Sequence, residues 1–159
     1  MNALTLLTND HKRVDRLFAE HKQVQGNPRR QKAIFDRVHR ELDIHAQIEE
    51  QIFYPEVKER AQTKKLEELV TESYEEHHFV DTIKAEIEGT PFEAEEWAAK
   101  FKVMKENIEH HADEEEEGKM FPKVRQVFNK EELEDMGTRM QELKEKLMSG
   151  APIEERTRS

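Results

Sequence analysis

Apolar side chains recur at intervals of three and four residues along most of the chain, with charged residues between them. Val14, Leu17 and Phe18 form one such group, and Val38 and Leu42 form another. This spacing gathers the apolar side chains on one face of an α-helix, so it indicates amphipathic helices with one buried side. The pattern predicts helices over residues 2–25, 28–60, 63–88, 91–128 and 130–148.

Residues that stop and start helices mark the predicted boundaries. Gly26-Asn27-Pro28 combines a helix terminator, an N-cap residue and a proline suited to the first helical position. Thr90 and Glu93 have the spacing of a capping box, and Asn129 with Glu132 provides a further helix start. We therefore expect helices joined by short turns.

These elements predict an all-α fold, an antiparallel up-down-up-down four-helix bundle with an additional C-terminal helix. The C-terminal helix carries an apolar stripe of its own, which we expect to pack on the bundle in preference to dimerising. The predicted divisions are the bundle over residues 1–128, the C-terminal helix over 129–149 and a flexible tail over 150–159.

Composition narrows the possible partners. Charged residues make up 39% of the chain, and the net charge of −10 would by itself be typical of a disordered acidic protein. The helical periodicity instead places most charges on solvated outer faces. The excess of acid disfavours nucleic acid and anionic membranes as partners. No apolar run approaches the length of a membrane span, and no signal peptide is evident, so we expect a cytoplasmic protein. The lack of cysteine excludes metal sites with thiolate ligands.

The chain also repeats itself weakly. An offset of 66 residues aligns His11 with His77 and His45 with His111. In both halves the second histidine follows the first by 34 residues. Because the agreement extends over two helices, it predicts two helical hairpins that face each other across a pseudo-twofold axis.

The repeated residues have a specific chemistry. His45 and Glu49 are four residues apart on the apolar side of the second helix, where a carboxylate is costly unless it is paired or binds a cation. His111 is followed by a run of acidic residues, and the first and third helices contribute His11 and His77. Histidine and carboxylate ligands without thiolate suit iron, manganese or zinc, and two carboxylates between two histidine pairs suit a dinuclear centre.

These motifs resemble the hemerythrin-like, or HHE cation-binding, domain family over about residues 3–128. The resemblance rests on Asp10-His11, His45 to Glu50 with Phe53-Tyr54-Pro55, Glu76-His77-His78, and His110-His111-Ala112 through Met120-Phe121-Pro122. It implies a four-helix bundle around an oxo- or hydroxo-bridged centre of two iron ions that meets dioxygen or related small oxidants. The metal ligands that it implies are His11, His45, Glu49, His77, His111 and one further carboxylate.

That further carboxylate has two candidates. The interval from the ligand histidine to the following proline is one residue longer in the second half of the chain than in the first. Counting forward from His111 selects Glu115, whereas counting back from Pro122 selects Glu116. We favour Glu116, with the extra residue absorbed in a π-bulge, because oxygen-carrying hemerythrins resemble this chain in having a five-residue step there.

The resemblance is incomplete on the third helix. Oxygen carriers use a pair of histidines four residues apart there, but the residue four before His77 is Ser73. The expected site therefore has four histidines and two carboxylates, with positions open to water or substrate. Glu76, Tyr74 or Tyr54 could occupy one of them. This departure argues against simple reversible oxygen carriage.

Three functions fit these expectations. The first is a non-haem di-iron protein that binds dioxygen, nitric oxide or peroxide for sensing, buffering, or iron and oxidative-stress homeostasis. The second is a catalase-like enzyme that decomposes peroxide at the same centre. The third is a helical interaction module without metal. The sequence leaves open whether the protein is an enzyme, and zinc or manganese are alternatives to iron.

Overall fold

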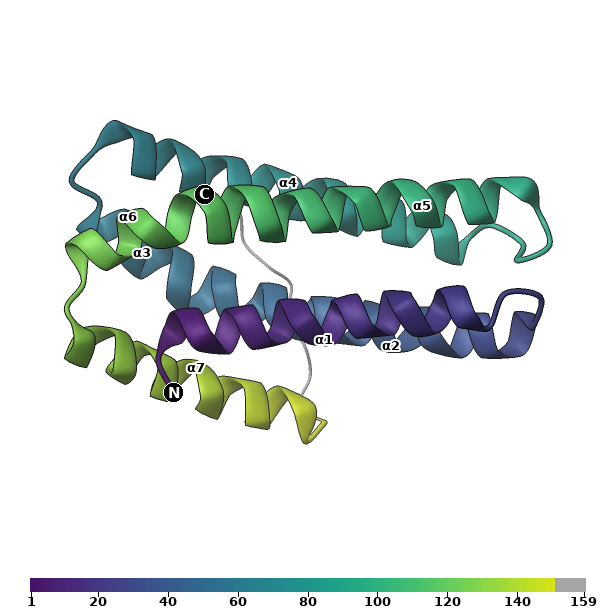
Figure 1. The fold of residues 1–159 in the computed structure, drawn as a ribbon, viewed down its shortest axis with the longest axis horizontal. Coiled ribbons are helices and arrows are strands. Elements are labelled where there is room, and N and C mark those ends of the chain that lie inside the picture. The colour runs from purple at the N-terminus through teal and green to yellow at the C-terminus, as the bar shows by residue number, and fades with distance from the viewer. Residues whose placement is uncertain (151–159) are drawn as a thin grey trace.

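The computed structural model describes residues 1–150, and every regular element within them is helical (Figure 1). The elements are α1 (Ala3–Gln23), α2 (Pro28–Ile48), the π-helical segment η1 (Glu49–Phe53), α3 (Tyr54–Arg60), α4 (Lys64–Glu88), α5 (Glu95–Glu109), the π-helical segment η2 (His110–Met120), α6 (Phe121–Val127) and α7 (Lys130–Met148). The segments α2, η1 and α3 follow one another without a break, as do α5, η2 and α6. The predicted all-α fold is confirmed. Apart from Gly150, the predicted tail lies outside the described residues.

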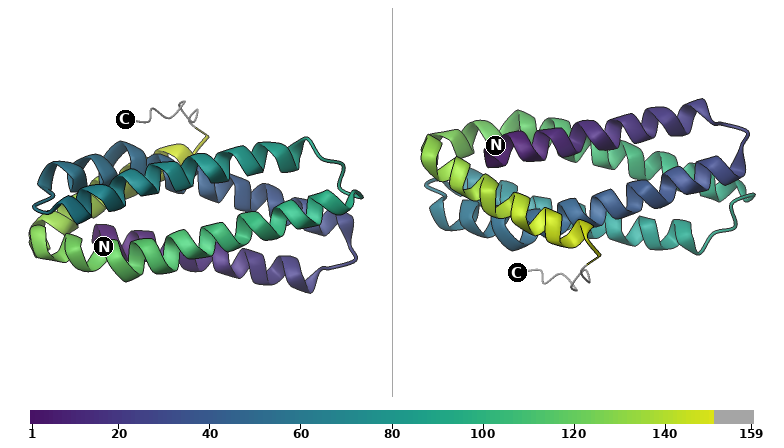
Figure 2. Two further views of the ribbon diagram at one scale, coloured as in Figure 1. Left: turned by 90° about the horizontal axis from the view of Figure 1, so that it is seen from above. Right: turned by 90° about the horizontal axis from the view of Figure 1, so that it is seen from below.

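The long helices form an antiparallel bundle of two hairpins (Figures 1 and 2). Helix α1 packs against α2, and α4 packs against α5. Helix α7 lies across the outside of the first hairpin, against α1 and α2. Within residues 1–150, no helix combines the length and apolar character needed to cross a membrane.

Local sequence explains most helix starts. The Asn27 side chain accepts a hydrogen bond of 3.2 Å from the Arg30 backbone N–H, directly before the proline that opens α2. At α7, Asn129 and Glu132 form the complete reciprocal capping box. Both predicted starts are confirmed.

The capping box predicted at Thr90 is wrong. The Thr90 hydroxyl donates a hydrogen bond of 2.6 Å to the carbonyl of Glu86, so it closes α4 instead of opening the next helix. Helix α5 begins only at Glu95, without a side-chain cap. The intervening segment places the Phe92 ring 4.7 Å from that of Trp97. Apolar packing of this turn therefore replaces the expected cap.

The buried apolar side chains form two clusters, one at each end of the bundle. The end covered by α3, α6 and α7 contains Leu6, Leu7, Ile48, Phe53, Leu69, Phe121 and Met136. The end at the α1–α2 and α4–α5 turns contains Phe18, Phe35, Ile87, Trp97 and Phe101. The candidate ligands lie between the clusters, in a polar layer across the bundle interior.

Each π-helical segment is closely followed by a proline, Pro55 after η1 and Pro122 after η2. Proline has no backbone N–H, so it cannot donate to the carbonyl four residues earlier, which belongs to Gln51 in the first half and Gly118 in the second. Loss of that hydrogen bond permits the wider π turn. The sequence predicts a π-helical turn only in the second half, whereas the structure has one in both halves.

Gly137 allows α7 to lie close to the start of α1. A Cβ atom at this position would meet the Met1 carbonyl oxygen and would lie 2.8 Å from the Ala3 nitrogen. We expect Gly137→Ala to lower the free energy of unfolding by about 1–3 kcal/mol, because overpacking outweighs the higher helix propensity of alanine. Urea unfolding of the metal-free chain measures this.

Gly89→Ala is the matched control, because the atom nearest its new Cβ would be 3.7 Å away, an ordinary contact. We expect it to change stability by less than about 1 kcal/mol. Equal effects at Gly137 and Gly89 would show that the close approach of α7 has no energetic consequence.

Candidate metal centre

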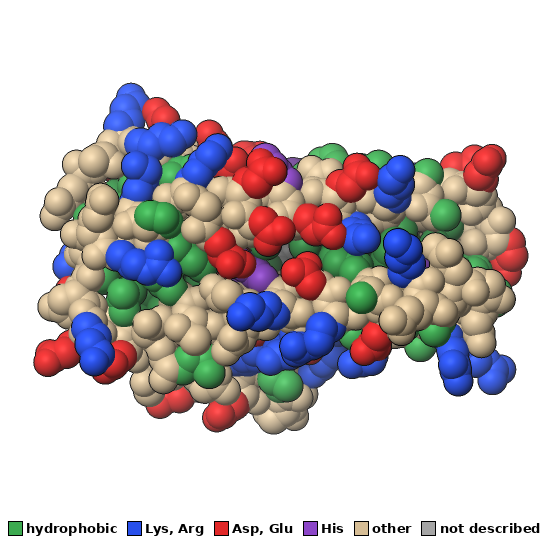
Figure 3. Space-filling view, viewed as in Figure 1, with side chains coloured by type: hydrophobic (Ala, Val, Ile, Leu, Met, Phe, Trp, Pro, Cys, Tyr) green, Lys and Arg blue, Asp and Glu red, His purple; other side chains and the backbone are tan. Residues whose placement is uncertain are grey.

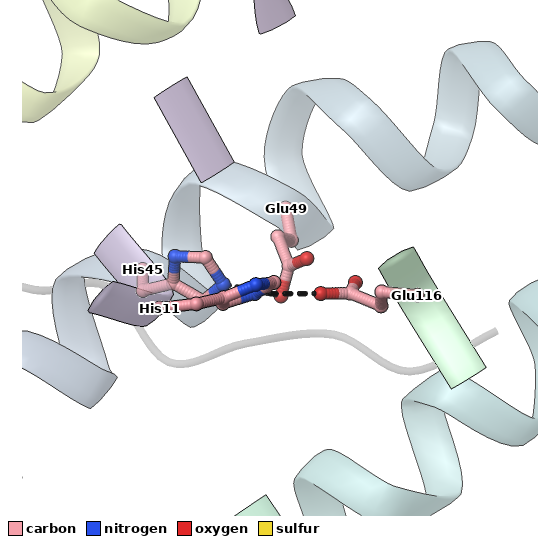
Figure 4. A group of neighbouring side chains, drawn as sticks. All are labelled: His11, His45, Glu49 and Glu116. Atoms are coloured by element: carbon pink, nitrogen blue, oxygen red, sulfur yellow. Dashed lines mark hydrogen bonds and ion pairs between the residues drawn. The ribbon is translucent and has the colours of Figure 1, made fainter. Parts of the chain in front are cut away.

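The structure brings all four predicted histidines together with two glutamates in the bundle interior. Their ligand atoms form two groups, each within 4.8 Å, composed of His11, His45, Glu49 and Glu116 in the first (Figure 4) and of Glu49, His77 and His111 in the second. Every one of these residues is less than a tenth exposed. The chain therefore contains two buried histidine–glutamate groups that are candidate metal sites and that share one carboxylate.

Glu49 is the shared residue, and it is fully buried. Its Oε1 lies 3.2 Å from Nε2 of His45 and 3.0 Å from Nε2 of His77. Both oxygens of Glu49 and Nε2 of His45 are buried without a hydrogen bond. Buried polar atoms without partners are costly, and a cation among them would remove that cost. The residues present therefore fit a bound metal.

Glu116 and Glu115 have different surroundings. Glu116 is fully buried, with one oxygen 3.0 Å from Nε2 of His11 and the other 3.4 Å from Nε2 of His111. Glu115 instead accepts a hydrogen bond of 3.1 Å from Lys119, a half-exposed residue one turn away. The geometry places Glu116 among the histidines and Glu115 outside them.

Each histidine directs Nδ1 away from the centre to a second carboxylate. The pairs are Asp10 with His45 at 2.9 Å, Glu50 with His77 at 2.8 Å, Glu76 with His111 at 2.6 Å and Glu117 with His11 at 2.6 Å. Such a partner fixes the ring orientation and the tautomer that presents Nε2 to a metal. We call these four residues the outer carboxylates.

The sequence analysis did not assign this role to the outer carboxylates, although the repeat contained a signal for them. Asp10 and Glu76 are 66 residues apart, the offset of the histidines. Glu50 and Glu117 are one residue further apart, as Glu49 and Glu116 are, because both pairs span the extra residue in η2. The pseudo-twofold relation therefore includes the partners of the ligands as well as the ligands.

The contacts between histidines and carboxylates determine which groups of the metal-free centre carry protons. Burial alone lowers the pKa of His111, but Glu116 and Glu76 outweigh it and raise the pKa to about 10. Burial likewise opposes ionisation of Glu116, yet His111 and His11 hold the pKa of that carboxyl well below its usual range. A metal that binds here must displace protons from the imidazoles, so its affinity should weaken in acid.

Tyr54 places a hydroxyl group at the centre. It donates a hydrogen bond of 2.5 Å to Glu116 and lies 3.3 Å and 3.2 Å from Nε2 of His77 and His111. Burial and the charge of Glu116 raise the pKa of Tyr54 well above its ordinary value, so the phenol keeps its proton. The equivalent residue in the second half is Phe121, so the two halves differ here. Tyr54 is one of the side chains that the sequence offered for an open position.

A cavity of about 50 Å³ adjoins the centre, and all four histidines line it. Its apolar walls come from Val14, Leu42, Val80 and Ile108. One water molecule occupies about 30 Å³ in the liquid, so the cavity has room for a diatomic molecule or a peroxide.

The mouth of the cavity is acidic. Figure 3 shows acidic side chains gathered over the middle of the face between α1 and α5, with histidine atoms visible among them. Asp15 lines the cavity, and burial together with the charges of Asp113 and Glu109 raises its pKa. A negative potential at the mouth favours cations and opposes anions.

Within the described residues, Lys84 is the one lysine or arginine that lines the cavity, and it is buried. It donates a hydrogen bond of 2.5 Å to Asp43 and lies 3.4 Å from Asp81. Burial raises the pKa of Asp43, but His39 and Lys84 outweigh it and lower the pKa to about 2. Ionised Asp43 therefore stabilises the folded chain.

This stabilisation should depend on pH. Because the folded pKa of Asp43 lies below the unfolded value, the contribution, about 2 kcal/mol, is present above pH 4 and is lost as the pH falls toward 2. We expect Asp43→Asn to destabilise the metal-free chain at pH 7 by that amount and to flatten the acid side of its stability curve. Urea unfolding at pH 7, 4 and 3 measures both effects. Asp36→Asn, on an exposed face, is the control, and parallel acid curves for Asp43→Asn and the unmodified chain would contradict the assignment.

Comparisons with known proteins agree with this geometry. A family model described as the hemerythrin HHE cation binding domain matches residues 2–124. An uncharacterized protein of Mycobacterium tuberculosis, Rv2633c, is 29% identical over 154 residues, which are 96% of this chain and 91% of that protein. The crystal structure of an HHE domain-containing homologue of Rv2633c from Mycobacterium kansasii has a TM-score of 0.76 at 27% identity and covers 96% of this chain and 95% of its own.

A longer relative is also similar. A DNA nickase of Nostoc sp. is 26% identical over 147 residues, or 92% of this chain. The match covers 40% of the nickase, so this chain spans less than half the length of that relative.

Proposed function

The chain belongs to the hemerythrin HHE cation-binding domain family, and on this premise we propose that it is a non-haem di-iron protein that binds dioxygen, nitric oxide or peroxide. Such a protein would serve in sensing, in buffering, or in iron and oxidative-stress homeostasis. The resemblance found in the sequence motifs is thereby confirmed at the level of the family. The observation that carries the proposal is that Glu49 belongs to both ligand groups. One carboxylate shared by two histidine pairs supports two cations side by side.

The proposed ligands divide between the two halves of the bundle. His11 and His45 would hold one iron, and His77 and His111 would hold the other. Glu49 would serve both, and Glu116, which belongs to the first group, also lies 3.4 Å from His111. Imidazole and carboxylate ligands suit iron, although manganese and zinc accept the same set. When bound, the irons would supply redox chemistry toward oxygen species. The chain itself orients the imidazoles through the outer carboxylates and limits the access of water.

The cavity supports small, uncharged ligands. Its volume of about 50 Å³ admits dioxygen, nitric oxide or hydrogen peroxide, and the apolar walls impose no hydrogen bonds on them. The acidic mouth opposes anions but not neutral molecules. Loading with ferrous or ferric ions would benefit from the same negative potential.

Peroxide decomposition is a second candidate function, and Tyr54 is the observation that favours it. Converting hydrogen peroxide to water and dioxygen requires protons to move between oxygen atoms at the reacting centre. The phenol of Tyr54 keeps its proton and donates it in a hydrogen bond to Glu116, so a proton is held there away from bulk water. Catalysis of this kind would make the protein an enzyme.

Elemental analysis of protein purified aerobically without a histidine tag tests the main proposal. We expect about two irons per chain, with absorption in the near ultraviolet that dithionite removes. Two zinc or manganese ions would reject iron while keeping a dinuclear centre. Less than a few tenths of any metal per chain would reject the proposal in favour of a metal-free helical module.

Steady-state peroxide consumption by the iron-loaded chain tests the second candidate. An enzyme would complete many turnovers, and Tyr54→Phe would slow them by about 100-fold or more without loss of iron, as expected for a lost acid–base group. Bleaching after about one equivalent of peroxide would reject catalysis and leave the binding function.

We do not extend nickase activity to this chain. The similarity covers 40% of the Nostoc protein, and this chain has a net charge of −10. Nucleic-acid binding depends mainly on basic residues that neutralise phosphates. The proposed partners are therefore small oxygen or nitrogen species and metal ions.

A further inference from the structure

Helix α7 reaches the metal centre through a buried lysine. Lys144 is 7% exposed and donates a hydrogen bond to Asp10 on α1. Asp10 also accepts a hydrogen bond of 2.9 Å from Nδ1 of His45. Nε2 of the same ring lies 3.2 Å from Glu49. A continuous series of contacts therefore leads from α7 to the carboxylate shared by both ligand groups.

The other half of the centre has a different arrangement. Glu76 is the counterpart of Asp10 and holds His111 at 2.6 Å. Within residues 1–150, no lysine or arginine forms an ion pair with Glu76, and its further neighbour is the half-exposed ring of His110 at 3.9 Å. Asp10, in contrast, also pairs with Arg13 at 3.1 Å. Asp10 is therefore held by a lysine from outside the four-helix bundle, whereas Glu76 is not.

The position of Lys144 is unusual for a lysine. It lies on the buried side of α7 with Met140 and Leu147, where an apolar residue would satisfy packing. A buried ammonium group is costly unless it is paired and hydrogen-bonded. Its pairing with Asp10 offsets that cost. Lys144 binds Oδ1 of Asp10, and His45 binds the other oxygen, Oδ2. Helix α7 also lies outside residues 2–124, the part that the family model matches.

We propose that Lys144 is a positioning residue for the metal centre, and that it acts through Asp10 to orient the ring of His45. Lys144 then supports one of the two metal positions, through Asp10 and His45, so the two positions are unequal. The inference rests on the proposed dinuclear function and adds a residue from outside the four-helix bundle.

Release of iron to a chelator from the loaded full-length chain tests this inference. Lys144→Met keeps the size of the side chain and removes its charge. We expect it to accelerate the release of one of the two irons by about 10-fold or more, as outer partners of metal ligands commonly do, and to leave the other unchanged. Lys144→Arg should retain slow release of both.

Two further variants show whether Lys144 acts through Asp10. Asp10→Asn should accelerate release of the same iron, and adding Lys144→Met to it should have no further effect. Glu76→Gln, the matched control, should accelerate release of the other iron. In the double variant with Lys144→Met, the effects of the two substitutions should be additive. Equal acceleration of both irons by Lys144→Met, or no acceleration, would overturn the inference.

A measurement without metal separates this inference from the proposed function. In the metal-free full-length chain with ¹⁵N-labelled histidine, Lys144→Met should shift the side-chain resonances of His45 and leave those of His111 in place. If the unmodified chain binds no metal, the proposed function fails, while this result would still support the contact from α7 to His45. Equal shifts of both rings, or none, would overturn the inference whether or not metal binds.

Discussion

Glu49→Gln is expected to abolish binding at both metal positions, with metal content falling from about two ions per chain to less than a few tenths. The reason is that Glu49 belongs to both ligand groups, so its loss removes one carboxylate ligand from each metal position. An amide keeps the size but removes the charge that two cations would share. Elemental analysis after gel filtration measures the loss.

Folding and surface charge are controlled separately in this experiment. Circular dichroism should show unchanged helix content in Glu49→Gln, because the two hydrophobic clusters on either side of the centre are intact. Glu68→Gln, which removes one exposed charge, should retain both metals. Full metal content in Glu49→Gln would mean that two ions bind without the Glu49 carboxylate, and it would contradict the assignment of Glu49 to both ligand groups.

Glu116→Gln and Glu115→Gln form the second test, and we expect them to differ sharply. The two changes are chemically identical and adjacent in the chain. Glu116 is fully buried between His11 and His111, whereas Glu115, 7% exposed, pairs with the half-exposed Lys119. Glu116→Gln should weaken metal binding by more than about 100-fold, beyond the range seen for outer partners of ligands.

Competition with a chelator of known affinity measures both variants. Glu115→Gln should remain within about threefold of the unmodified chain, because Glu115 contacts the half-exposed Lys119 and belongs to neither ligand group. Equal losses in the two variants would contradict a unique second carboxylate and would indicate that η2 shifts its register when metal binds.

Helix positions could be predicted because their causes are local. Spacing of three and four residues is a property of one helix, and Asn27 and Asn129 act on N–H groups within the next turn. Thr90 was misassigned because its hydroxyl can serve either adjacent helix, and only the packing of Phe92 on Trp97 decides between them. Local chemistry was sufficient where one helix was involved and insufficient where two competed.

The candidate ligands could be predicted as a set because the repeat preserves them. The repeat preserves the outer carboxylates too, but not which carboxylate pairs with which histidine. His45 and Glu49 are neighbours on one helix, so their relation is visible in the chain. The bond between Asp10 and His45 joins two helices, and that between Lys144 and Asp10 joins residues 134 apart. Among so many acidic residues, no local feature distinguishes an outer carboxylate from one on a solvated face.

The sequence by itself therefore determined the helices, the pseudo-twofold repeat and the chemistry of the candidate ligands, because each depends on residue type and on spacing within one helix or its copy. Only the tertiary structure placed Glu116, and not Glu115, among the histidines, placed the hydroxyl of Tyr54 at the centre and connected α7 to His45. Those outcomes depend on the register of π-helical turns and on how separate helices pack. A shift of one residue rotates a side chain by about 100° around the helix, so the choice of ligand is made by the packed bundle and not by the order of residues.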